Sequence, residues 1–333
     1  MVFLQKLAER ARETGSRIVL VEGHDERVCQ AALRLQESGL LDPILLVPGS
    51  SVGLAARWDG PLACPADHPE LERYAELYRQ IQTKERLDAE TARRRVTDPL
   101  VFAGLMLRAG DADGAVAGAA HATADVVRAA LRTVGTAPEA KMVTGAFYMV
   151  VSSFRGTPEH EVLTFADAGV IPDPDAEQLM EIARQTAIMR RAIVGDDPRI
   201  AFLSFSTRGS ADNPAVEKMR RAHDLFRELC PQVAADGELQ ADAALIRHVG
   251  QRKAPDSPVA GHANVLIFPD LGAANIAYKL VERLAGATAI GPILHGLAKP
   301  YNDMSRGADP ESIAAVAYVT ALMATAKPGG PCG

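Results

Sequence analysis

The chain has 333 residues, and its 36 Lys+Arg against 42 Asp+Glu give a formal net charge of −6. Hydrophobic residues make up 47% and charged residues 23%, which is globular composition and excludes a disordered or fibrous chain. The mild acidity argues against nucleic-acid binding through bulk charge. Because a single hydrophobic core stops growing near this length, we expect two domains of about 150 residues each.

Cysteine usage and the N-terminal segment bear on the cellular setting. Cys29, Cys64, Cys230 and Cys332 are widely spaced and form no Cys-x-x-Cys pair. This pattern predicts neither a zinc site nor a disulfide scaffold, and it favours a reducing, cytoplasmic setting. Residues 1–17 carry charges throughout, as an amphipathic helix does and a signal sequence does not. No run of about 18 apolar residues occurs, so we expect no membrane span.

Short apolar runs alternate with helical patterns after this first helix. The expected strands are residues 18–21, 44–47, 114–117, 162–165, 200–205, 264–268 and 289–294. The expected helices are residues 26–35, 124–131, 176–189, 214–229, 274–284 and 310–324. This alternation predicts an α/β fold of βαβ units around mostly parallel sheets. Two glycine- or proline-broken runs, residues 138–156 and the Gly291-Pro292 break, are the expected crossings between two lobes.

The common functional motifs do not identify an activity for this sequence. No Gly-x-Gly-x-x-Gly follows the first expected strand, which argues against an ordinary dinucleotide-binding fold. Residues 49–53 match Gly-x-Ser-x-Gly, but Pro48 breaks the strand before them and no long helix follows. We therefore interpret them as a turn rather than a nucleophile elbow. The chemistry must lie in less generic segments.

The most unusual segment is residues 296–307, Gly-Leu-Ala-Lys-Pro-Tyr-Asn-Asp-Met-Ser-Arg-Gly. It places short polar side chains around Arg306 and leads into the helix expected at Pro310. Helix-start N–H groups, a guanidinium fork and Gly307 together suit the binding of an anion. A capping loop with a surface arginine explains the same residues equally well.

Four other segments likewise allow a functional and a structural interpretation. Residues 203–211 are rich in serine at the carboxyl end of a strand, where ligands collect in open α/β sheets, although a plain turn is the simpler interpretation. Residues 114–128 combine small residues with Arg128, which suits either close approach of a ligand or tight packing. The turn-rich stretches 236–242 and 253–264 hold carboxylates that suit proton transfer or backbone capping.

Taken together, these segments resemble the phosphotransacetylase (phosphate acetyltransferase) family, within the wider phosphate acetyl/butyryltransferase group. The resemblance covers nearly the whole chain and keeps the family order. It rests on residues 22–27, 112–121, 165–167, 203–211, 236–242, 257–261, 263–271, 275–279 and 296–307.

The resemblance implies two three-layer αβα domains with mostly parallel sheets and an active-site cleft between them, as in isocitrate and isopropylmalate dehydrogenases. The first domain would comprise residues 1–139 plus 292–333, and the second residues 140–291. It further implies a homodimer that transfers acetyl groups reversibly between acetyl phosphate and coenzyme A. Coenzyme A would be a substrate, with no permanently bound cofactor, no metal and no nucleic-acid or membrane partner.

By motif match, the resemblance assigns Ser305, Arg306 and Arg128 to the active site. The family aspartate that is proposed as the base for the thiol is replaced by Ser312, so we expect Glu311 or Asp303 to substitute for it. Gln82 stands where the family carries an arginine, and Ala274 where it carries a glycine. The residues expected to bind substrate are His121, Thr123, Ser206, Thr207, Arg208, Gly209, Ser210, Lys253, Ser257, Gly261, Asn302 and Gly307.

The expected reaction brings a thiol against an acyl phosphate when both substrates are anionic. Arg306 and Arg128 would hold the phosphate bidentately, and one cleft for both substrates removes the entropy cost of their encounter. Ser305 and nearby backbone N–H groups would stabilise the charge that develops on the carbonyl oxygen.

Three other functions stay open. A phosphate butyryl- or propionyltransferase would use the same chemistry with a larger acyl pocket. A non-catalytic acyl-CoA sensor is suggested by Gln82 and Ser312, whereas Ser305, Arg306 and Arg128 favour catalysis. An isocitrate-dehydrogenase-like oxidoreductase would need clustered metal-binding aspartates, which this sequence does not have.

Overall fold

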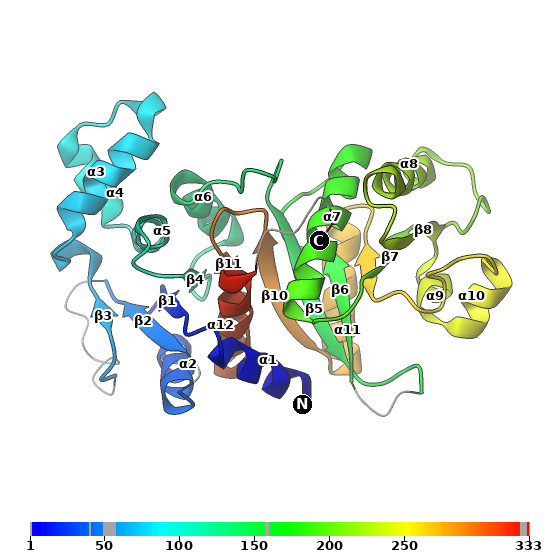
Figure 1. Cartoon of the computed structure of the whole chain (residues 1–333), viewed down its shortest axis with the longest axis horizontal. Helices are drawn as coiled ribbons and strands as arrows, with labels where there is room; N and C mark the ends of the chain where they lie inside the picture. The colour runs from blue at the N-terminus through cyan, green and yellow to red at the C-terminus, as the bar shows by residue number, and fades with distance from the viewer. Residues whose placement is uncertain (1, 40, 49–57, 157–159, 327–331, 333) are drawn as a thin grey trace. The chain divides into compact units, whose positions relative to one another are not determined.

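The computed structural model describes the chain apart from residues 1, 40, 49–57, 157–159, 327–331 and 333. The predicted turn at residues 49–53 therefore lies outside the described residues. The chain divides into two compact units, each built around its own sheet (Figure 1). The N-terminal unit comprises residues 4–142 and 296–325, and the central unit residues 1–3, 143–295 and 326–333. Residues 1–3, 292–295 and 326–333, which we had expected in the first domain, group with the central unit, whereas residues 140–142 group with the N-terminal unit.

The sheet of the N-terminal unit is entirely parallel, in the order β11-β4-β1-β2-β3. Its strands are β1 (Arg17–Leu20), β2 (Asp42–Leu46), β3 (Leu62–Ala63), β4 (Gly114–Ala117) and β11 (Tyr301–Asp303). Val19 pairs with Ile44 on one side and Ala115 on the other, and Asn302 pairs with Val116. Because neighbouring strands run in the same direction, the loops after β1, β4 and β11 leave from one edge.

Helices cover both faces of this sheet (Figure 1). One face packs against α2 (Glu26–Glu37) and α12 (Pro310–Thr325), and the other against α5 (Pro99–Ala109) and α6 (Thr123–Thr133). Helices α3 (Leu71–Ile81) and α4 (Ala89–Val96) pack together and contact α5, and α1 (Val2–Arg12) precedes β1. Short 3-10 helices cover Pro65–Asp67 and Thr83–Glu85. The layered α/β architecture is the predicted one.

The central unit has a mixed sheet in the order β10-β5-β6-β9-β7-β8. Its strands are β5 (Thr144–Val151), β6 (Glu161–Ala166), β7 (Arg199–Leu203), β8 (Ala234–Leu239), β9 (Val265–Ile267) and β10 (Thr288–His295). The pairs among β6, β9, β7 and β8 are parallel, whereas β5 pairs antiparallel with β6 and β10. Strand β5 lies inside the run that we interpreted as a crossing, since its eight buried residues lack alternation.

Helices again flank this second sheet. Helices α7 (Ala176–Ile193) and α8 (Pro214–Leu229) pack side by side on one face (Figure 1). Helix α11 (Leu271–Ala285) shares a buried apolar core with the sheet and with residues of the short helix α9 (Ala241–Leu245) that follows β8. The short helix α10 (Arg247–Lys253) packs against α9. Among the helices that the structure describes, none is long and apolar enough to cross a membrane.

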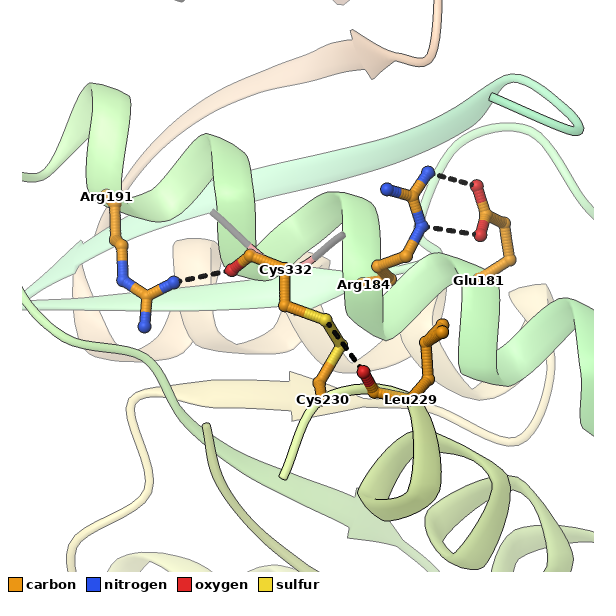
Figure 2. Close-up of a disulfide and its surroundings, with 6 residues drawn as sticks. All are labelled: Glu181, Arg184, Arg191, Leu229, Cys230 and Cys332. Atoms are coloured by element: carbon orange, nitrogen blue, oxygen red, sulfur yellow. Dashed lines mark hydrogen bonds and ion pairs between the residues drawn. A yellow bond between two sulfur atoms is a disulfide. The ribbon is translucent and has the colours of Figure 1, made fainter. Parts of the chain in front are cut away.

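Cys230 and Cys332 form a disulfide, which the cysteine spacing did not predict. Their Cα atoms lie 5.7 Å apart although the residues are 102 positions apart in sequence. Figure 2 shows Cys332 between the end of α8, at Leu229 and Cys230, and Arg191 of α7, whose Nη1 donates to the Cys332 carbonyl at 2.6 Å. Sequence spacing could not reveal this pair, because it forms only when the last residues return to α8. Cys29 and Cys64 are free thiols.

The disulfide predicts the thiol count and part of the stability. Titration of the unfolded, unreduced chain should find the thiols of Cys29 and Cys64 alone, and reductant should expose all four. Cross-linking residues so far apart lowers the conformational entropy of the unfolded chain. In the loop-entropy account this raises the free energy of unfolding by up to about 5 kcal/mol. Reductant should therefore lower the Tm of the wild type and of the control Cys64→Ser, but not that of Cys332→Ser. An equal effect on all three proteins would contradict this role.

Candidate active site

Three loops meet at the carboxyl edge of the first sheet, because β11, β4 and β1 are neighbours. The loop after β1 contains Glu22 and Asp25, the loop after β4 contains Gly118 and His121, and the loop after β11 contains Ser305. In parallel sheets this edge is where ligands bind. We call these three segments the strand-end loops.

Glu22 joins two of the strand-end loops from a fully buried position. Its Oε1 accepts hydrogen bonds from the backbone N–H of Gly118 at 2.8 Å and of Ala120 at 3.4 Å. His121 Nδ1 lies 2.8 Å from the same oxygen and donates to it. This hydrogen bond raises the pKa of His121 against the effect of burial. The other oxygen, Oε2, has no hydrogen-bond partner among the described residues.

Asp303 is the second buried carboxyl group, at the end of β11. Its Oδ2 accepts a hydrogen bond from Thr123 Oγ1, in the first turn of α6, at 2.5 Å. Burial raises the pKa of Asp303 to about 7, although the hydrogen bonds from Thr123 and the Met304 backbone lower it; the charge on Glu22 raises it further. Asp303 Oδ1 is also without a partner in the described part of the chain. The carboxyl group therefore titrates near neutrality.

Gly118 lets the loop after β4 approach the loop after β11. Its φ of +110° lies in a region that L side chains rarely adopt. A Cβ there would stand 2.1 Å from Asp303 Oδ1 and 2.6 Å from the Met304 carbonyl oxygen. The position thus requires glycine, and a larger residue would push apart the two loops that Glu22 and Asp303 hold.

The loop after β11 presents Ser305, Arg306 and Gly307 to solvent. The Ala308 N–H donates to the Ser305 carbonyl at 2.9 Å and closes a turn, and Gly307 N–H donates to Ser305 Oγ at 3.3 Å. Within the described residues, the Arg306 guanidinium has no hydrogen-bond or ion-pair partner, so its donors are available to an anion.

We expected the backbone N–H groups at the start of α12 to be free to bind an anion, but one of them already has a partner within the protein. Asp309 precedes the helix and accepts a hydrogen bond from the Ser312 N–H at 2.8 Å. An acidic cap occupies one donor of the first turn and places negative charge beside the others. An anion at this edge would therefore rely on Arg306 rather than on the helix start.

The other predicted residues of the N-terminal unit have different surroundings. Arg128 is exposed on α6 and pairs with Asp125 at 2.6 Å. Glu311 is exposed in the first turn of α12. Asn302 is fully buried and donates to Thr320 Oγ1 of α12 at 2.9 Å, so its side chain is turned away from the strand-end loops. Gln82 ends α3 and donates to the Arg132 carbonyl at 2.6 Å.

In the central unit, the predicted loop 206–210 surrounds Glu238. Ser206 Oγ and the Gly209 N–H donate to Glu238 at 2.8 and 2.9 Å, and Arg220 Nε donates at 2.9 Å. Burial raises the pKa of Glu238, but these hydrogen bonds outweigh burial and lower it to about 2. Arg208 pairs with Asp236 at 2.7 Å, so the loop's donors already face carboxylates.

The remaining predicted residues extend the same region. Thr207 Oγ1 accepts from the Gln240 N–H at 2.9 Å, and Lys253 Nζ donates to Gln240 Oε1 and Asp242 Oδ2, each at 2.9 Å. The other residues of this group have the following contacts: Ser210 Oγ lies 3.2 Å from Ser206 Oγ, Ser257 Oγ accepts from the Val259 and Ala260 N–H groups, and a Cβ on Gly261 would lie 2.6 Å from Arg247 Cα. The structure thus joins Thr207 and Lys253 in one polar network, separate in sequence from Ser305.

Two residues of the site received no role in our sequence analysis, namely Glu22 and Arg27. Both lie in the segment 22–27 that supports the family resemblance, which was their only signal. Most of their partners are backbone groups of distant loops, which no spacing rule reveals. No group of three or more His, Cys, Asp or Glu residues able to hold a metal occurs among the residues described.

These features define an α/β protein whose candidate site is an exposed serine and arginine at the carboxyl edge of a parallel sheet. The family described as Phosphate acetyl/butaryl transferase matches residues 2–321. The chain therefore belongs to the phosphate acetyl/butyryl transferase family, whose members are acyltransferases.

Individual relatives agree over their full length. The chain is 43% identical over 328 residues to "Phosphate acetyltransferase" of Thermoanaerobacterium thermosaccharolyticum, covering 97% of this chain and 100% of that protein. It is 43% identical to the enzyme of the same name from Paracoccus denitrificans, covering 96% and 98%. Among solved structures, a phosphotransacetylase from Streptococcus pyogenes superimposes with a TM-score of 0.87 at 40% identity, covering 96% and 98%.

The raised pKa of Asp303 predicts a pH dependence of stability. The folded-state pKa of about 7 exceeds the unfolded value of about 3.9, so between them the folded state holds a proton that the unfolded state has lost. This group's contribution to the free energy of unfolding therefore falls as pH rises from 4 to 7. The Tm of Asp303→Asn minus the Tm of the wild type should therefore increase by at least about 3 °C between pH 5 and pH 8.

Asp309→Asn is the matched control. Hydrogen bonding to Ser312 lowers the pKa of Asp309, so its contribution should stay constant over the same pH range. A constant difference between the wild type and Asp303→Asn from pH 5 to 8, measured by thermal unfolding, would contradict the assignment.

Proposed function

We propose that the chain transfers an acetyl group reversibly between acetyl phosphate and coenzyme A, in a ternary complex. The observation that carries this proposal is the Arg306 guanidinium, which has no partner in the described part of the chain and lies next to Ser305. The loops around it are tied together by buried Glu22 and Asp303. Family membership and the names of the full-length relatives support the acetyl group and phosphate as substrates.

Phosphate recognition in this proposal uses two arginines. Arg306 offers an unpaired fork that matches two phosphate oxygens. Among the residues that the structure describes, Arg128 pairs only with Asp125. An exposed ion pair of this kind contributes about 0–1 kcal/mol, so a dianion can displace the carboxylate. Coenzyme A and acetyl phosphate act as substrates, and no cofactor remains bound through the cycle.

The chemical step is attack of the coenzyme A thiolate on the acetyl carbonyl carbon. The C–S bond forms, charge develops on the carbonyl oxygen, and the C–O bond to phosphate breaks, so that phosphate leaves with the electron pair. Ser305 Oγ and nearby backbone N–H groups stabilise the oxyanion. A base accepts the thiol proton, since a thiol with a pKa of about 8.5 is mostly protonated at neutral pH.

Two carboxyl groups are candidates for that base. Asp303 has a pKa matched to neutral pH but is fully buried, whereas Glu311 is exposed in the first turn of α12. The pH dependence of kcat in Asp303→Asn and Glu311→Gln distinguishes them, because only loss of the base removes the acidic limb.

The proposal also includes a homodimer acting in the cytoplasm. Helix α11 exposes Ile276, Leu280 and Leu284 by 62%, 52% and 81%. Their spacing of four residues places them on one face, and a second copy of the chain is the proposed partner for it. The cytoplasmic location stays a prediction, and the disulfide is uncommon in a reducing compartment.

The test is thioester formation from acetyl phosphate and coenzyme A, compared between the wild type, Arg306→Ala and the exposed control Arg94→Ala. Loss of a charge-assisted phosphate contact should lower kcat/KM by about 100-fold or more in Arg306→Ala and leave Arg94→Ala unchanged. Equal rates for all three proteins would contradict the site assignment. Faster turnover of butyryl phosphate would favour the longer-chain transferase, and acetyl-CoA binding without turnover would favour a sensor.

A further inference from the structure

Arg27, in the first turn of α2, uses every N–H group of its guanidinium within the protein. Nε and Nη2 donate to the two oxygens of Asp25 at 3.0 and 2.7 Å. The second donor of Nη2 reaches the Ala119 carbonyl at 3.1 Å. Nη1 donates to the carbonyls of Arg306 at 2.6 Å and Ala308 at 3.1 Å. One side chain thus connects all three strand-end loops.

This arrangement differs from that of an arginine available to bind substrate. A guanidinium has five N–H donors, and all five of Arg27 have protein acceptors, so none is left for an anion. The two carbonyls that its Nη1 binds, those of Arg306 and Ala308, belong to the exposed turn, where they would otherwise face water. Arg27 therefore acts on the backbone of the turn and not on a ligand.

The two carbonyls on Nη1 flank Gly307, the residue of the turn with the widest conformational freedom. Holding the Arg306 carbonyl fixes the peptide plane after Arg306 and so restricts the direction in which its side chain leaves the backbone. Holding the Ala308 carbonyl fixes the other end of the turn, after Gly307. Lysine could not do the same, because its ammonium lacks the planar fork that spans Asp25 and the carbonyls together.

We propose that Arg27 is a positioning residue, which holds the turn 305–307 in the conformation that presents Ser305 and Arg306 to the acyl phosphate. This role rests on the proposed function for its effect on catalysis. The effect on the turn itself is independent of that function.

The test compares Arg27→Lys with Arg17→Lys. Arg17 is the first residue of β1, at the amino end of the strand, whereas the strand-end loops lie at the carboxyl end. Its guanidinium likewise joins a carboxylate to a carbonyl, with Nε 3.4 Å from Asp113 and Nη2 2.9 Å from the Gly110 carbonyl oxygen. Arg17→Lys therefore controls for the loss of an arginine that bridges loops. Measurements are kcat and KM for each substrate, and hydrogen–deuterium exchange of the backbone at 304–309.

Arg27→Lys should lower kcat/KM for acetyl phosphate by about 100-fold, the scale expected for a misplaced catalytic group. The KM for coenzyme A should stay within about threefold of wild type, and exchange at 304–309 should accelerate. Arg17→Lys should change neither the kinetic constants nor the exchange at 304–309. Wild-type kcat/KM with unchanged exchange in Arg27→Lys would overturn the proposal.

Two further outcomes separate this inference from the proposed function. Faster exchange at 304–309 in a chain whose wild type makes no thioester would retain the positioning role and overturn the proposed function. If Arg27→Lys does not fold, Asp25→Asn replaces it, since asparagine caps a helix as well as aspartate but holds the guanidinium less strongly. No change in exchange or in kcat/KM for Asp25→Asn would then overturn the positioning role.

Discussion

The candidate site depends on the parallel pairing of β1, β4 and β11, which brings three polar loops to one edge of a buried sheet. Each loop carries backbone groups that must find partners away from water. Glu22 accepts from the loop after β4, and Asp303 accepts from the start of α6. Arg27 donates to the loops after β4 and β11. The exposed turn with Ser305 and Arg306 is ordered because the groups beneath it are connected.

Burying two carboxyl groups so close to this edge has an electrostatic cost. Each keeps one oxygen without a partner in the described structure, and the charge on Glu22 raises the pKa of Asp303. In the central unit the opposite balance holds, because Arg220 and the loop 206–210 stabilise the charge of Glu238 and lower its pKa. The hydrogen bonds at Glu238, with the charged Arg220 among the donors, therefore outweigh burial, whereas those at Asp303 do not.

The sequence predicted the layered α/β fold because most strands and helices have their own periodicity. It failed for β5, which is buried on both faces and so shows no alternation, and for β3 and β11, which are short. It also failed for β8, whose Asp-Gly-Glu residues we had interpreted as part of a turn-rich stretch. Ser305 and Arg306 were proposed through their motif, and the structure places both of them exposed in the loop after β11. Arg27 was not given a role, because its partners are carbonyls nearly 280 positions away that any residue type could supply. Likewise, the pairing of Cys230 with Cys332 depends on tertiary structure alone.

The central claim is that the phosphoryl group of the substrate binds at the carboxyl edge of the first sheet. A crystal structure of the protein soaked with inorganic phosphate tests it most directly, because phosphate is also the proposed product. The account predicts phosphate on the Arg306 guanidinium and within hydrogen-bond distance of Ser305, with the five contacts of Arg27 unchanged. Phosphate bound only at the loop 206–210, or Arg27 turned outward to bind it, would contradict the account.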